Sequence, residues 1–152
     1  MPDGSRKFRT LQGFCNGTEP VEDEYFAFLA SLRIHGAGLP FEEIEKSLGL
    51  NATYVHRIGE RKGPRSPVYS DDAWHFTPLL SESVDLAEQI DSLWKALKPS
   101  ASYLRELKKS FKVDVFCGYR TNCDHAGISI PSRSLEMFVE LEIPFGLSII
   151  VA

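Results

Sequence analysis

The chain has 152 residues, of which 43% are hydrophobic and 25% are charged, and its formal net charge is −4 at pH 7. These are ordinary values for a globular domain, and a chain of this length can bury one sizeable core without a metal or a disulfide. The mild negative charge argues against a general nucleic-acid binder. No stretch approaches the ~18 consecutive apolar residues of a membrane span, so we expect no membrane partner.

The three cysteines, Cys15, Cys117 and Cys123, are an odd number that cannot all pair within one chain. A domain of this size has no need of bridges, so a reducing cytoplasm is the simplest interpretation. The first residues carry no apolar segment of the kind found in signal peptides. We therefore expect a soluble cytoplasmic protein.

Residues 1–24 are rich in glycine, proline and acidic side chains, which predicts a flexible or loosely docked arm before a single domain over residues 25–152. The segment Tyr25–Ile34 then alternates with a period of two, which predicts a strand with one buried face. The buried parity carries Phe26, Phe28, Ala30, Leu32 and Ile34.

A helix is predicted from about Pro40 to Leu48, because proline suits the first helical position and Gly49 suits the position after the last turn. Further strands are predicted at 53–58, 73–77, 111–119 and 145–151, separated by a polar loop at 59–72 and another at 120–127. Helices are predicted at 81–97 and 100–110, and a last one beginning near Ser132 or Ser134 with Leu135, Phe138 and Val139 on its apolar face.

This order of elements predicts an α+β fold in which helices cover one face of an antiparallel or mixed sheet, with a ferredoxin-like outline. Placing Leu39-Pro40 over Ile130-Pro131 also indicates an internal βαβ pseudo-repeat, because each unit has a glycine turn, a proline start and a short helix. The second face of the sheet would be open to solvent or to a partner.

Several segments together resemble a known family: RIHGAGLPFEEIEKSLGL, HRIGE, the lone Trp74 before a long helix, LWKALKP, VDVFCGY and the closing GISIPSRSLEMFVELEIPFGLSII. The chain is similar over about residues 25–151 to the uncharacterised, mainly bacterial domain of unknown function 4279. The resemblance implies no established activity. HRIGE approximates the basic-Gly-Asp pattern expected there, with Glu60 at the acidic position.

One cluster has the residue types of a metal or thiol site, because Cys117, Cys123, Asp124 and His125 lie close together in the sequence. The spacing contains no CxxC pair, and the parity of Cys117 places it on a buried strand face, so a structural cysteine beside a loop histidine is the simpler interpretation. No glycine-rich phosphate loop, nucleophile elbow or paired-carboxylate motif is present, so no catalytic residue or cofactor is predicted.

Two charged surfaces are candidates for contact with a protein partner. Arg57, Arg61, Lys62 and Arg65 make a basic loop, which has no neighbouring aromatic residue on which a nucleic-acid base would stack. The acidic residues of the long predicted helix, which lie away from its apolar stripe, are Asp85, Glu88 and Asp91. Either set could equally be a solvated surface, and the sequence does not fix the oligomeric state.

The sequence therefore favours a non-enzymatic protein-interaction module, of an immunity or regulatory type, in which an acidic surface attracts a basic partner. The alternative is a small metal- or thiol-dependent enzyme that uses the region from Cys117 to His125.

Overall fold

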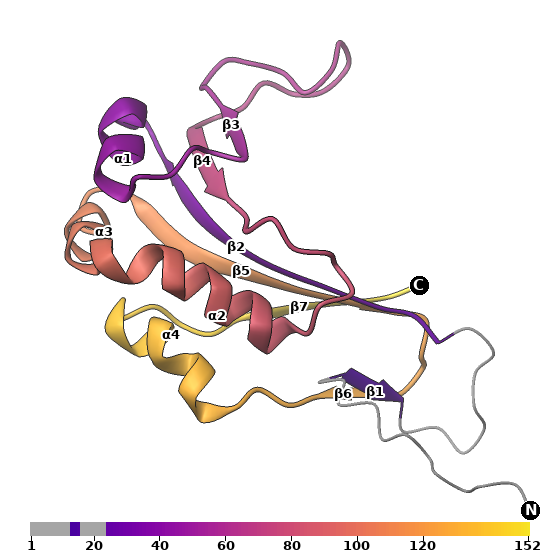
Figure 1. Cartoon of the computed structure of the whole chain (residues 1–152). Helices are drawn as coiled ribbons and strands as arrows, with labels where there is room; N and C mark the ends of the chain where they lie inside the picture. Colours follow the sequence, from indigo (N-terminus) through magenta and orange to yellow (C-terminus); the bar gives the residue numbers. More distant parts are fainter. Residues whose placement is uncertain (1–12, 16–23) are drawn as a thin grey trace, which may run out of the picture.

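The computed structural model describes residues 13–15 and 24–152. Its main sheet has five strands in the order β3-β4-β2-β5-β7 (Figure 1). In chain order these are β2 (Phe26–Gly36), β3 (Tyr54–His56), β4 (Asp72–Phe76), β5 (Lys112–Thr121) and β7 (Leu147–Val151). The pairs β2/β4, β2/β5 and β3/β4 are antiparallel and β5/β7 is parallel, so the sheet is mixed.

The helices pack on one face of this sheet and form a single core with it. They are α1 (Phe41–Leu48), α2 (Leu86–Leu97), α3 (Ala101–Leu107) and α4 (Glu136–Glu140), with short 3₁₀ turns η1 (Lys98–Ser100) and η2 (Ser132–Leu135). A separate two-stranded ribbon pairs β1 (Gly13–Cys15) with β6 (Ala126–Ile128). The rest of the expected arm, 1–12 and 16–23, lies outside the described residues. None of the described helices is long and apolar enough to span a bilayer.

Strand β2 is central because its alternation gives it one fully apolar face. Phe28, Ala30, Leu32 and Ile34 are each at most 1% exposed, whereas Leu29 on the opposite face is 39% exposed. The predicted buried parity is therefore confirmed at these positions. Burial of each large side chain contributes roughly 1.5 to 3 kcal/mol. β5 pairs with β2 from Phe26↔Thr121 to His35↔Lys112, and its predicted alternation is confirmed as well.

The chain order β2-α1-β3-β4-α2-β5 is the β-α-β-β-α-β order of a ferredoxin-like unit, so the predicted outline is confirmed. β7 extends that unit as a fifth strand beside β5. The two units of the predicted pseudo-repeat, β2-α1-β3 and β5-α4-β7, both have a proline before the helix, but their strands are arranged differently in the sheet. β5 and β7 are neighbours, whereas β4 lies between β2 and β3.

Two helix predictions differ from the structure. The helix predicted from Ser81 begins at Leu86, because Ser81 and Ser83 hydrogen-bond to each other (2.9 Å) and form a turn before it. In α4, Val139 is 74% exposed instead of buried, whereas Met137 and Phe138 face the core. The preceding 3₁₀ turn has three residues per turn, which shifts the phase of the apolar stripe.

Candidate functional site

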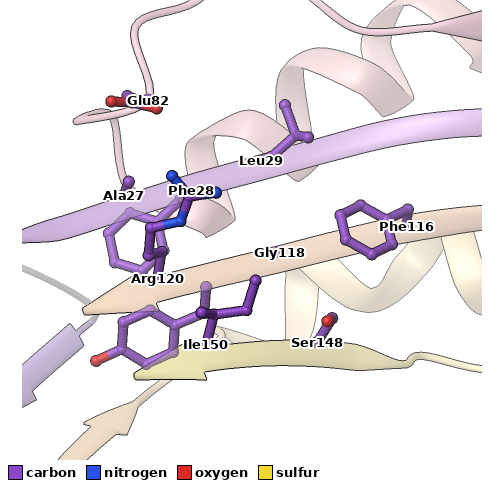
Figure 2. Close-up of a pocket in the computed structure, with 10 residues that line it drawn as sticks. Ala27, Phe28, Leu29, Glu82, Phe116, Gly118, Arg120, Ser148 and Ile150 are labelled. Carbon is purple, nitrogen blue, oxygen red and sulfur yellow. The ribbon is translucent and has the colours of Figure 1, made fainter. Parts of the chain in front are cut away.

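The face of the sheet that carries no helices is hollowed at one end. Leu29 of β2, Gly118 of β5 and Ser148 of β7 are cross-strand neighbours on this face. Because Gly118 has no side chain, this row leaves a groove of about 170 Å³ between the larger side chains around it. Figure 2 shows that the lining comes from β2, β5 and β7, with Glu82 from the segment before α2. We call this hollow the sheet groove.

The walls of the sheet groove are apolar and remain accessible to solvent. Leu29 and Ile150 are 39% and 50% exposed, and Phe116 is half-buried. Arg120 is exposed at one end of the groove and has no ion-pair partner among the described residues. The arrangement offers an apolar contact beside a cationic one.

The groove continues onto the edge strand β7, which pairs on one side only within residues 13–15 and 24–152. Ile149, Ile150 and Val151 are each at least half exposed, and the sequence LSIIV contains no charge or proline. Charges and prolines are the usual protection of edge strands against pairing with another chain. This edge is therefore open to a further strand.

In the middle of the open face, Arg33 and Asp114 form a bidentate ion pair with N···O distances of 2.7 and 2.9 Å. Arg33 also lies over the ring of Phe116, 5.0 Å from its centroid. The pair satisfies both charges, so neither is free to contact a ligand. It separates the sheet groove from the opposite end of the face.

That opposite end carries three of the four histidines of the chain, His35, His56 and His75. The Nε2 atoms of His35 and His75 lie 2.9 Å apart. Burial, followed by the nearby His35, lowers the pKa of His75 to about 4, so this ring is neutral at physiological pH. Among the described residues, His35, His56 and Asp71 form the one set of three possible metal ligands.

The residues of the alternative metal or thiol site, Cys117, Cys123 and His125, do not form a reactive centre. Cys117 points into the core at 1% exposure, and burial raises the pKa of its thiol to about 12. Cys123 is disulfide-bonded, contrary to the expectation that this chain needs no bridge. His125 is exposed in the following loop. Neither cysteine supplies a thiolate at neutral pH, so the structure does not support the Cys117 to His125 alternative.

The charged residues singled out from the sequence lie on two separate surfaces. Glu88 and Asp91 are exposed on α2, on the helix side of the sheet, while Asp85 is half-buried at the N-cap position of that helix. Arg57, Arg61 and Arg65 are all exposed in the loop between β3 and β4. Arg57 stacks on Phe41 at 4.3 Å, and Arg61 donates to the Ser66 carbonyl at 2.8 Å.

Sequence reasoning did not single out the sheet groove or the histidine cluster. The signal for the cluster was present, because His56 and His75 fall within predicted strands and His35 follows directly after one. Periodicity assigns a strand residue to a face but does not say which strands are neighbours. The groove depends in the same way on three residues from three strands, Leu29, Gly118 and Ser148.

The structure defines the class of the protein as an α+β domain with a ferredoxin-like strand order. A fifth strand, β7, is added parallel to β5, and the described helices leave one face of the sheet uncovered. The family model "Domain of unknown function (DUF4279)" matches residues 23–152, so the chain belongs to this family. No curated protein and no solved structure is significantly similar to it.

Proposed function

We propose that this protein is an interaction module that binds an extended segment of a partner protein along β7 and the sheet groove. The observation that carries the proposal is the unprotected edge of β7, whose apolar side chains Ile149, Ile150 and Val151 are at least half exposed. An added strand would form main-chain hydrogen bonds with this edge, and its side chains would enter the neighbouring groove.

The chemistry of the groove defines the segment that it would accept. Leu29, Phe116 and Ile150 favour an apolar side chain at its centre. Arg120, which has no ion-pair partner among the described residues, favours an acidic side chain next to it. The partner segment is therefore an extended strand that combines an apolar anchor with a carboxylate.

The acidic and basic surfaces are secondary parts of this proposal. Glu88 and Asp91 would attract basic regions of a partner of the immunity or regulatory type, and Arg57, Arg61 and Arg65 would attract acidic regions of the same partner. Steering changes the association rate and its dependence on salt more than the final affinity. Charge reversal at Glu88 and Asp91 is expected to slow association without abolishing the complex.

The bridge at Cys123 bears on the compartment of the interaction. Disulfides persist in oxidising compartments, so this bond favours such a compartment over the cytoplasm that the sequence favours.

The experiment is an affinity capture from the native cells, with the wild type and matched variants as bait. Ile150→Lys disrupts the apolar edge, and Gly118→Val fills the groove, because a Cβ at Gly118 already comes within 3.0 Å of the Phe116 ring. Val139→Lys is the control, since Val139 is an exposed apolar residue on the helix side. We expect one partner that is retained by the control and lost with both groove variants. A partner that Ile150→Lys and Gly118→Val retain would refute the proposal.

A further inference from the structure

His35 and His56, at the end of the open face opposite the sheet groove, lie close together because the residue between them, Ala73, is small. His35 of β2 and His56 of β3 both pair with Ala73 of β4, so the three residues form one cross-strand row. The methyl group of Ala73 leaves the space above β4 free, and the two rings approach to 6.2 Å between centroids. Asp71 lies two residues before Ala73, on the same parity, and brings its carboxylate between the rings.

The two histidine–carboxylate distances in this group are close to the ligand spacing of a metal site. Asp71 Oδ2 lies 3.3 Å from His35 Nδ1, and Asp71 Oδ1 lies 3.4 Å from His56 Nε2. All three ligand atoms lie within 4.8 Å of one another. A tetrahedral zinc ion with bonds of about 2.0 to 2.1 Å holds its ligand atoms about 3.3 to 3.4 Å apart. We propose that His35, His56 and Asp71 bind a divalent transition-metal ion such as Zn²⁺.

The hydrogen bonds around His56 orient its ring for this role. Tyr54 donates its hydroxyl proton to Tyr69 at 3.1 Å. The Tyr54 oxygen then accepts from Nδ1–H of His56 at 3.0 Å, which leaves the Nε2 lone pair directed toward Asp71. Tyr69 also stacks on the ring of His56, with centroids 3.6 Å apart.

His35 has an equivalent support on its other side. Its Nε2 lies 2.9 Å from Nε2 of His75, which can accept the proton of His35 and so leave Nδ1 free for the metal. Ligating histidines commonly donate their second N–H to such a partner, which fixes the ring and its tautomer. Tyr54 and His75 are positioning residues of the site, and neither would contact the ion.

The site also has the charge and the access that a cation requires. Asp71 contacts no lysine or arginine among the described residues, so its charge is not already neutralised by a basic side chain. The side chains of His56, His35 and Asp71 are 10%, 24% and 39% exposed. The ion would therefore enter from solvent and keep water in the remaining coordination positions.

The test is a titration of the full-length, tag-free, chelator-treated protein with ZnCl₂, followed by calorimetry and elemental analysis. We expect one zinc per chain with a Kd tighter than about 10 µM. His56→Gln and Asp71→Asn should each weaken binding at least about 100-fold, and His75→Gln about 10-fold. His125→Gln is the matched control, because His125 is the one histidine outside the cluster, and it should bind as the wild type does.

Thermal melting separates loss of the site from loss of the fold. Saturating zinc should raise the Tm of the wild type and of His125→Gln but not that of Asp71→Asn. Asp71 is 39% exposed, so its replacement leaves the core intact even if His56→Gln fails to fold. Absence of one-to-one zinc binding in the wild type, or an unchanged affinity in Asp71→Asn, would overturn the proposal.

Discussion

Gln89 shows how one buried polar side chain completes the sheet. β4 pairs only with residues 32–36 of β2, so the first half of β2 has no neighbouring strand on that side among the described residues. Gln89 of α2, which is 3% exposed, donates to the Phe28 carbonyl at 2.8 Å and accepts from the Ala30 N–H at 3.3 Å. The segment before α2 adds a bond from the Phe28 N–H to the Glu82 carbonyl at 2.7 Å. The main-chain groups of Phe28 and Ala30, which a neighbouring strand would otherwise bind, are thus hydrogen-bonded by α2 and the segment before it.

Replacement of Gln89 by leucine should therefore destabilise the fold, although leucine is an apolar residue suited to a buried position. The change leaves the Phe28 carbonyl and the Ala30 N–H buried without these partners. We expect the free energy of unfolding in urea to fall by about 2 to 4 kcal/mol. Glu88→Gln, at the exposed neighbouring position, should change it by less than about 0.5 kcal/mol. Equal stabilities for the two variants would contradict this role of Gln89.

The cysteines lead to a prediction of differential alkylation. Cys117 is buried with its pKa raised to about 12 by that burial, and Cys123 is disulfide-bonded. Iodoacetamide should label neither residue in the native protein at pH 7.5, because alkylation requires an accessible thiolate. Denaturation without reductant should expose Cys117 but not Cys123, and a reductant should then release Cys123. Peptide mapping by mass spectrometry reads out both sites, and labelling of Cys123 before reduction would contradict the disulfide.

At the scale of elements, one polar contact ties α4 to α2. Trp94 donates its Nε1–H to Glu136 at 2.6 Å, and Lys98 Nζ lies 3.3 Å from the same carboxylate. These contacts, the Trp94 hydrogen bond first, lower the pKa of Glu136 below its usual value. Folding therefore favours the ionised carboxylate.

This contact should contribute less stability in acid. The contribution of a carboxylate with a lowered pKa is present above the unfolded-state value of 4.5 and is lost as the pH falls through the folded-state value. We expect Glu136→Gln to be less stable than the wild type at pH 6, with the difference shrinking at pH 3.5. Urea unfolding at both values measures this difference, and Glu140→Gln on the exposed side of α4 is the control. A difference that does not change with pH would contradict the assignment.

At the scale of the whole molecule, protection should fall from the centre of the sheet to its edge. β2 has strands on both sides over 32–35 and a face that is fully buried, whereas β7 is paired on one side and exposed. Local opening costs least where few buried contacts hold a segment. We expect the amides of Leu32 and Ile34 to exchange with deuterium at least about 100-fold more slowly than those of Ser148 and Ile150. Equal protection in the two strands would contradict this order.

The sequence alone determined the local parts of this fold. The two-residue period of β2 and β5 and the helix after Pro40 can be read from neighbouring residues, because they follow from backbone geometry and local side-chain sterics. The same reasoning supplied the α+β class and the resemblance that the family match confirmed. It placed the start of α2 and the exposed Val139 wrongly, because a serine turn and a 3₁₀ turn changed the local phase.

The tertiary structure decided which distant residues meet. His35, His56 and Asp71 come together because β4 lies between β2 and β3 and presents only the small Ala73. The sheet groove exists because Leu29 and Ser148 become the neighbours of Gly118. A hydrophobic period assigns each residue to a face, but the order of strands depends on how the whole chain buries its apolar surface. The architecture was therefore predictable from the sequence, whereas both candidate sites required the strand order.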